Sequence, residues 1–200
     1  KTMNWKNNKV LVTGGASFIG SHLTEQLIEL GAKVRIADNF SSGEKSHIKS
    51  LDCEILEGDL LNPEFCDQAT HDIETVFHLA ADHGGRGYID VHQVECSTNM
   101  ILDGQVFRHA HQNGVEKIIF ASSGCVYPTS AQMDVSEEVF LYEVMVTPPY
   151  EADDLYGWAK LMAELTLKAY HQQLGISTAS CRYFTVYGPR CTENHAVMAM

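Results

Sequence analysis

KVLVTGGASFIG, at residues 9–20, is the stretch that decides the fold of this 200-residue chain. Residues 9–13 are an apolar run that predicts a buried strand, and apolar residues at helical spacing predict a helix over residues 18–30. The glycines between them let the backbone approach a pyrophosphate closely, and the helix N-terminus offers it free N–H groups. The stretch therefore predicts a dinucleotide-binding turn, in which Ser17 stands where a middle glycine is usual.

Beyond this stretch, the chain alternates short apolar runs with longer amphipathic segments. Helical periodicity predicts two further helices, over residues 93–112 and 154–173. Strands that alternate with helices pair in parallel through right-handed crossovers. The expected fold class is therefore α/β, with a doubly wound parallel sheet of the Rossmann type. Its further strands are predicted over residues 33–37, 53–56, 75–79, 117–121 and 177–184.

The charge of the chain excludes two classes of partner. It has 14 Lys and Arg against 26 Asp and Glu, a formal net charge of −12. Nucleic-acid-binding proteins cluster Lys and Arg, and anionic lipid surfaces attract the same residues. No apolar run approaches the roughly 20 residues of a membrane span. We therefore expect neither nucleic acid nor a membrane as a partner.

The six cysteines include no C-x-x-C pair and fall below the density of a disulfide scaffold. Residues 1–9 are polar and lack the apolar core of a secretory signal. We interpret the cysteines as reduced thiols and expect a cytoplasmic protein. Cys191 and His195 have metal-ligand spacing, but no second pair accompanies them, so no metal is expected.

Asp38 ends the second predicted strand, eighteen positions after Gly20. A carboxylate there accepts hydrogen bonds from a ribose 2′-hydroxyl and repels a 2′-phosphate, so it favours NAD over NADP. The alternative interpretation is that Asp38 only begins the turn at residues 38–43.

Tyr156 and Lys160 form a Y-x-x-x-K pair, one helical turn apart on the helix predicted at residues 154–173. A free tyrosine has a pKa of about 10, and a lysine charge about 4 Å away would lower it by about three units at an effective dielectric of about 20. The pair is therefore suited to take a proton from a hydroxyl while hydride leaves the same carbon.

Together these motifs resemble the extended short-chain dehydrogenase/reductases that act on nucleotide sugars, the epimerase/dehydratase family. The resemblance covers essentially the whole chain and rests on VTGGASFIG, Asp38, GDL at 58–60, HLAA at 78–81, SSGCVYP at 122–128, the Y-x-x-x-K pair and RYFTVYGPR at 182–190. It implies NAD as cofactor and Ser123 as the catalytic serine that holds a sugar hydroxyl. Asp38 would bind the adenosine ribose, and Asp59 and Leu60 the adenine. The full set of residues that it places along the cofactor is Gly14, Ser17, Phe18, Ile19, Gly20, Asp38, Asn39, Asp59, Leu60, Ala80, Ala81, Asn99, Tyr156 and Lys160.

Two stretches are most similar to the GDP-mannose 3,5-epimerases and the related GDP-fucose synthases. Residues 81–89, ADHGGRGYI, resemble their glycine-rich substrate loop, which makes Gly84, Gly85 and Arg86 expected substrate contacts. Cys125 stands where those enzymes use a cysteine for proton transfer beside a transient 4-keto sugar, and His195 lies roughly where the synthases have the partner histidine. Thiols and imidazoles, with pKa values of about 8.5 and 6.5, suit proton transfer at carbons that a neighbouring ketone acidifies. The alternatives are a small core cysteine and a surface histidine.

The leading hypothesis is an NAD-dependent epimerase that inverts carbon 3 or 5 of a GDP-mannose-type sugar. Thr185 replaces the asparagine with which the family usually contacts the substrate, and UDP-glucuronate 4-epimerases also carry threonine there. A carbon-4 epimerase of a UDP-hexose or UDP-glucuronate, with Thr185 at the substrate, is therefore the alternative. A dehydratase is less favoured, since Gly124 and Cys125 replace the acidic pair of those enzymes. A non-catalytic NAD-binding sensor is less favoured, since the catalytic serine, tyrosine and lysine are all present.

The resemblance also implies a domain division and an assembly. Residues 1–185 are expected to form the NAD-binding domain, and residues 186–200 the start of a smaller substrate lobe that is largely missing. We therefore expect the chain to be the N-terminal part of a longer protein. Related enzymes commonly dimerise through two long helices, here residues 93–112 and 154–173, so a homodimer is expected.

Overall fold

Six parallel strands form the centre of the molecule, which the computed structural model describes over residues 4–133, 136 and 138–191. The strand order is β3-β2-β1-β4-β5-β6, and neighbouring strands pair in parallel throughout. The chain runs outward from β1 to β3, returns to the centre, and runs outward again from β4 to β6. This order confirms the expected doubly wound α/β sheet. The strands are β1 Lys9–Thr13, β2 Lys33–Asp38, β3 Glu54–Glu57, β4 Thr75–His78, β5 Lys117–Ser123 and β6 Ser177–Tyr183.

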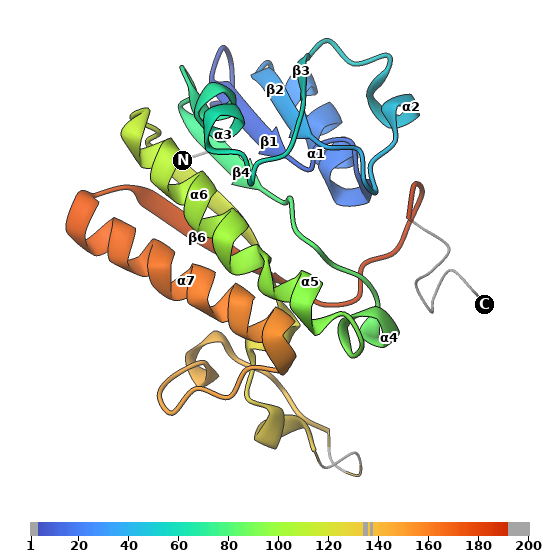
Figure 1. The fold of residues 1–200 in the computed structure, drawn as a ribbon, viewed down its shortest axis with the longest axis vertical. Coiled ribbons are helices and arrows are strands. Elements are labelled where there is room, and N and C mark those ends of the chain that lie inside the picture. The colour runs from blue at the N-terminus through green and yellow to red at the C-terminus, as the bar shows by residue number, and fades with distance from the viewer. Residues whose placement is uncertain (1–3, 134–135, 137, 192–200) are drawn as a thin grey trace.

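Helices cover both faces of the sheet (Figure 1). α3, α6 and α7 pack side by side on one face, and α1 packs on the other. The α-helices are α1 Phe18–Glu29, α2 Lys45–Ile48, α3 Pro63–Thr70, α4 Arg86–Ile89, α5 Gln93–Ser97, α6 Asn99–Gln112 and α7 Asp154–Leu174. The described residues between β5 and α7 form three short 3-10 helices: η1 Gly124–Val126, η2 Thr129–Gln132 and η3 Glu143–Met145.

Alternate side chains of β1 contribute to two separate cores. Val10 and Val12 pack with Leu27 of α1, whereas Leu11 packs with Phe107 of α6 on the opposite face. All three β1 side chains are fully buried. A parallel strand covered on both faces has a continuous apolar sequence, which is why residues 9–13 predicted this position.

The single helix predicted over residues 93–112 is wrong, because the segment forms two helices that meet at Thr98. The Thr98 N–H bonds to the carbonyl of Glu95, three residues back, and the Thr98 hydroxyl donates to the same carbonyl at 2.6 Å. The threonine side chain thus competes with the regular helix pattern at this junction. No helix was predicted where α3 lies; Asn62 caps α3, and Pro63 stands at its first position.

The topology brings the loops after β1, β4 and β5 to the same edge of the sheet. The strand order reverses between β1 and β4, and open α/β sheets bind ligands at such a switch point. The segment between β5 and α7, yellow to orange in Figure 1, places η1 against the start of α7. The turn between β1 and α1 and the start of α7 therefore lie at this same edge.

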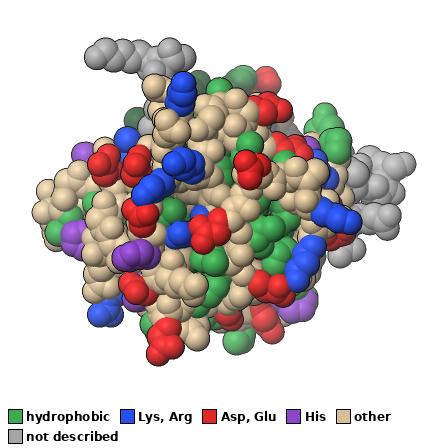
Figure 2. All heavy atoms as spheres, turned by 90° about the horizontal axis from the view of Figure 1, so that it is seen from above, with side chains coloured by type: hydrophobic (Ala, Val, Ile, Leu, Met, Phe, Trp, Pro, Cys, Tyr) green, Lys and Arg blue, Asp and Glu red, His purple; other side chains and the backbone are tan. Residues whose placement is uncertain are grey.

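The surface carries charges of both signs. On the face shown in Figure 2, acidic and basic side chains are interspersed rather than gathered by sign. Among the helices of the described residues, none has the length and apolar character needed to cross a membrane.

Candidate active site

The turn between β1 and α1 is held by close backbone packing. Gly14 has a φ of +67° and donates its N–H to the carbonyl of Ala37 at 2.9 Å. A Cβ on Gly20 would overlap the carbonyl oxygen of Gly14, so α1 starts directly against the turn. Ser17 is accommodated because its φ is −80° and its hydroxyl donates to the Gly14 carbonyl at 2.6 Å. The first turn of α1 contains no acidic residue and no side-chain cap, which leaves its N–H groups for an anionic ligand.

A first cavity lies beside this turn. Thr98 lines this cavity, although it was not predicted there. Asn99 was predicted to line it and does not. Asn99 is fully buried instead, and its amide accepts from the Asp82 N–H at 2.7 Å and donates to the Asp82 carbonyl at 2.8 Å. The lining includes most residues expected along the cofactor, namely Gly14, Ser17, Asp38, Asn39, Asp59, Leu60, Ala80 and Ala81, together with the unpredicted Ser41, Ser42, Gly58, Thr98 and Leu102.

Asp38 has two roles in this cavity: it organises the surrounding backbone, and it lines the cavity wall. Its carboxylate accepts the N–H of Ala16 at 2.9 Å and the N–H of Phe40 at 2.8 Å, so it organises both the glycine turn and the loop after β2. It also lines the cavity, where a carboxylate has lone pairs left for a ribose hydroxyl. The turn and ribose interpretations of Asp38 are therefore compatible. With the backbone-lined turn and the N-terminus of α1, this carboxylate fits NAD.

A second cavity of about 470 Å³ adjoins the first, because Ser17, Leu79 and Ala81 line both. Residues from the catalytic, cofactor and substrate predictions meet in it. Its lining includes Ser123, Cys125, Tyr156, Lys160, Gly84, Gly85, Arg86, Thr185, Phe18 and Ile19. Sequence reasoning missed Gln132, Asp153, Tyr183, Phe184 and Val186, which also line it. His195, predicted as catalytic, lies outside the described residues.

Tyr156 and Lys160 lie one turn apart on α7, with the lysine deeply buried. Lys160 is 2% exposed, and its Nζ lies 5.7 Å from the centre of the Tyr156 ring and 4.7 Å from that of Phe120. Burial lowers the pKa of Lys160, and burial is also the largest cause that raises the pKa of Tyr156. Hydrogen bonding with Ser123 opposes the rise at Tyr156. The expected lowering of the tyrosine pKa is therefore not found, because desolvation of the phenolate outweighs the hydrogen bond with Ser123.

Ser123 ends β5, and Cys125 follows in η1. Ser123 Oγ accepts the N–H of Cys125 at 3.2 Å, which fixes both residues at the wall of the second cavity. The Cys125 carbonyl accepts the N–H of Asp153 at 2.9 Å, and a Cβ on Gly157 would lie 2.5 Å from the same oxygen. α7 therefore begins directly against η1, which brings Tyr156 beside Ser123.

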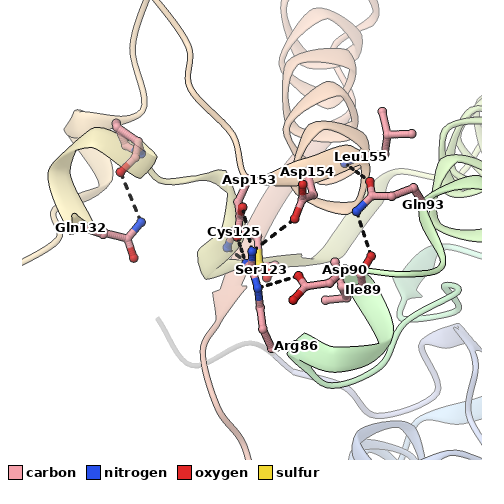
Figure 3. Close-up of polar contacts among 11 residues, drawn as sticks. Arg86, Ile89, Asp90, Gln93, Ser123, Cys125, Gln132, Asp153, Asp154 and Leu155 are labelled. Carbon is pink, nitrogen blue, oxygen red and sulfur yellow. Dashed lines mark hydrogen bonds and ion pairs between the residues drawn. The ribbon is translucent and has the colours of Figure 1, made fainter. Parts of the chain in front are cut away.

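Arg86, expected at the substrate, is engaged by three carboxylates. Its guanidinium contacts Asp153, lies 2.8 Å from Asp90 Oδ1 and lies 3.3 Å from Asp154 Oδ2. The hydrogen bond with Asp153 is the largest cause that raises the pKa of Arg86. Figure 3 shows the side chain reaching from α4 toward Asp153 and Asp154 at the start of α7. Arg86 therefore links the glycine-rich loop at residues 81–89 to the start of α7.

Metal-ligating side chains do not cluster in the part of the chain that the structure describes. No group of three His, Cys, Asp or Glu side chains there is arranged to hold a metal ion. Cys191 lines the second cavity, and His195, the other member of the spaced pair, is outside the described residues.

Known proteins have sequences and folds that are similar to those of this chain. The NAD dependent epimerase/dehydratase family matches residues 10–200. GDP-mannose 3,5-epimerase from Arabidopsis thaliana is 34% identical, over 92% of this chain and 48% of that protein. A putative UDP-glucose 4-epimerase from Methanocaldococcus jannaschii is 32% identical, over 90% of this chain and 57% of that protein. The structure of Thermus thermophilus UDP-glucose 4-epimerase in complex with NAD has a TM-score of 0.82 at 29% identity, covering 95% of this chain and 59% of that one.

The chain spans about half the length of the curated relatives it matches. The family match and the relative solved with NAD agree with the glycine turn, Asp38 and the two adjoining cavities, and they identify NAD as the cofactor. This protein therefore belongs to the NAD-dependent epimerase/dehydratase family, within the extended short-chain dehydrogenase/reductases.

Proposed function

We propose that this chain carries the cofactor site and catalytic groups of a nucleotide-sugar epimerase that acts through a transient 4-keto sugar. The favoured reaction is inversion at carbon 3 or carbon 5 of a GDP-mannose-type substrate. One observation carries the proposal: Ser123, Cys125, Tyr156 and Lys160 line a single cavity together with the loop at residues 84–86. The likeness to GDP-mannose 3,5-epimerase supports the same choice.

Oxidation at carbon 4 requires a group that takes the hydroxyl proton. In the proposed mechanism, Ser123 holds the sugar hydroxyl, Tyr156 removes its proton, and the ammonium of Lys160 stabilises the phenolate. Gly14, Ser17 and Asp38 would hold NAD, which would supply the hydride acceptor for carbon 4 and a positive charge in addition to that of Lys160. The added charge matters because burial holds the pKa of Tyr156 above its ordinary value.

The thiol of Cys125 has a separate part in this mechanism. A ketone at carbon 4 acidifies the protons on carbons 3 and 5, and the Cys125 sulfur exchanges a proton with one of these carbons on one face. Inversion requires a second group on the opposite face, and His195 is the proposed partner. When hydride returns to carbon 4, Tyr156 gives its proton back to the oxygen, so the protein ends the cycle as it began.

The full-length protein, incubated in heavy water with GDP-mannose, UDP-glucose and UDP-glucuronate, tests this function. We expect deuterium at carbon 3 or 5 of the product. Cys125→Ala should stop that uptake while the chemistry at carbon 4 continues. Epimerisation at carbon 4 without deuterium uptake would remove Cys125 from the mechanism.

Carbon-4 epimerisation of a UDP-sugar is the second candidate. Thr185 lines the second cavity, and the Methanocaldococcus and Thermus relatives are both named as UDP-glucose 4-epimerases. In this reaction the 4-keto sugar turns over in the cavity and takes hydride back on its other face. Cys125 then has no chemical part, and Cys125→Ala should leave the rate of epimerisation near that of the wild type.

We also propose that the protein forms a homodimer. α5 and α6 pack along α7, and exposed apolar side chains occur on all three helices. An apolar face of this kind is typical of a protein–protein interface, and two copies would join their helices into one layer. The side chains are Val94, Met100, Ile101, Leu155, Trp158 and Met162.

A further inference from the structure

A buried polar chain lies behind the cofactor turn and the catalytic helix. Its members are Thr13 at the end of β1, His78 at the end of β4 and Asp103 on α6, which are 0%, 0% and 2% exposed. His78 Nδ1 lies 2.7 Å from Thr13 Oγ1, and His78 Nε2 lies 3.0 Å from Asp103 Oδ1. The proposed mechanism uses none of these three residues.

The proton positions in this chain follow from its donors. Thr13 Oγ1 accepts the N–H groups of Leu79 at 3.0 Å and Ala80 at 3.1 Å, so its own proton is left for His78. The hydroxyl therefore donates to Nδ1, the imidazole proton stays on Nε2, and Nε2–H donates to Asp103. His78 thus carries its ring proton on Nε2, and Asp103 Oδ1 accepts that hydrogen bond.

The polar chain Thr13–His78–Asp103 has the same residue types as the hydroxyl–imidazole–carboxylate triads of hydrolases, but its hydroxyl is not a nucleophile. The Thr13 hydroxyl is fully buried and makes three hydrogen bonds, so a substrate does not reach it. Two of those bonds fix the backbone at Leu79 and Ala80, where the loop that lines the cavities begins. This end of the chain therefore holds a cofactor loop in place.

The other end of the polar chain is Asp103, which belongs to α6, the helix that packs along α7. Asp103 Oδ2 is buried and has no hydrogen-bond partner among the described residues. α6 packs along α7, where the Lys160 ammonium lies over the Phe120 ring, and His78 packs on the same ring with centroids 5.9 Å apart. An isolated buried charge is costly, so a carboxylate on α6 and an ammonium on the adjoining α7 would each offset part of the other's cost.

We propose that Asp103 is a positioning residue that holds Lys160 as an ammonium beside Tyr156, and that His78 and Thr13 connect this charge to the cofactor loops. Burial lowers the pKa of Lys160, and the charge of Asp103 opposes that fall; burial raises the pKa of Tyr156, and the charge of Asp103 adds to that rise. The proposal rests on the proposed function only for its kinetic test. The titratable groups of neighbouring elements that lie around Tyr156 and Lys160 are His78 of β4, Tyr183 of β6, Cys96 of α5, Asp103 of α6 and Cys125 of η1.

Asp103→Asn removes the charge but keeps the size of the side chain and an acceptor for His78. Ionisation of Tyr156 sets the acid limb of kcat/KM, and loss of the Lys160 proton sets the alkaline limb. Because the carboxylate raises both pKa values, we expect both limbs to move to lower pH by about one unit. A merely structural residue would change the rate without moving both limbs in this direction. Asp67→Asn, which removes a carboxylate with a 57% exposed side chain on α3, should leave both limbs in place.

Lysine labelled with carbon-13 at Cε gives a readout that does not depend on turnover. In the full-length protein with NAD bound, we expect Lys160, assigned with Lys160→Arg, to titrate at lower pH in Asp103→Asn than in the wild type. An unchanged Lys160 titration overturns the proposal, whether or not a sugar is turned over. Absence of turnover together with a shifted titration contradicts only the proposed function. Asp103→Ser carries the same test if the asparagine variant does not fold.

The connection to the cofactor loops has its own test. Thr13→Val leaves the N–H groups of Leu79 and Ala80 without their acceptor, and we expect NAD affinity to fall about tenfold. Thr13→Ser keeps the hydroxyl and should restore the affinity. Equal affinity in Thr13→Val and the wild type would overturn this part of the proposal.

Discussion

Gly157, the residue after Tyr156, lies against the backbone carbonyl of Cys125, and a Cβ on this glycine would stand 2.5 Å from that oxygen. Real Cβ atoms do not approach an oxygen this closely, so only glycine lets α7 begin so near to η1. Tyr156 belongs to α7 and Ser123 immediately precedes η1, and the distance between them therefore depends on this contact.

Gly157→Ala is expected to lower kcat at least about tenfold, because a displacement of about 1 Å in a catalytic group costs up to about 10²-fold. Steady-state kinetics and thermal unfolding measure the effect. Gly104→Ala on α6 is the matched control, since nothing lies within 4 Å of a Cβ there. A kcat equal to that of the wild type in Gly157→Ala would show that this contact does not position Tyr156.

Gly20→Ala should weaken NAD binding at least about tenfold, a loss of about 1.4 kcal/mol. The added methyl overlaps the Gly14 carbonyl and forces α1 away from the turn, which displaces the N–H groups that receive the pyrophosphate. Isothermal titration calorimetry with NAD measures this loss, again with Gly104→Ala as control. Unchanged affinity in Gly20→Ala would mean that the pyrophosphate does not sit on this turn.

Arg86→Met is expected to reduce kcat/KM by freeing the glycine-rich loop from the start of α7. If the arginine acts through Asp153, the same substitution should have little further effect in an Asp153→Asn background. If it contacts the substrate directly, its effect should persist in full there. The double-mutant cycle in kcat/KM therefore separates the two roles.

Ile101→Glu should convert the proposed homodimer to a monomer, because it places a charge on the apolar face of α6. Ile101 is 62% exposed in the single chain, and Leu30, at the end of α1, is similarly exposed at 56%. Leu30→Glu is therefore the matched control and should remain dimeric. Sedimentation velocity measures both variants, and a wild-type protein that sediments as a monomer would contradict the proposal.

Local patterns were sufficient to predict the sheet and to place Tyr156 and Lys160 on the same face of a helix. Residues 9–13 form a strand buried on both faces, so their continuous apolar run predicted it directly. Tyr156 and Lys160 are one turn apart on a helix, and this spacing already places them on the same face. Cys125 was predicted from the resemblance to enzymes that use a cysteine at this place, and it lines the same cavity as Ser123.

Features that depend on contacts between distant segments could not be predicted in this way. Arg86 is engaged by carboxylates at the start of α7, 67 and 68 positions further along the chain, and such pairings leave no local pattern. The spacing of Tyr156 and Lys160 predicts their proximity but not the deep burial of Lys160 or the desolvation of Tyr156, which reverses the expected direction of the tyrosine pKa. Which of two adjacent residues, Thr98 or Asn99, lines the first cavity depends on how the junction of α5 and α6 is turned.

In the proposed reaction, epimerisation passes through oxidation at carbon 4 within one active site that contains Tyr156. A sugar nucleotide that the protein turns over, labelled with deuterium at carbon 4, tests this claim most directly. We predict that the product keeps the label, that turnover is slower than with the unlabelled sugar, and that Tyr156→Phe abolishes the reaction. Loss of the label to water, or an undiminished rate in Tyr156→Phe, would contradict the claim.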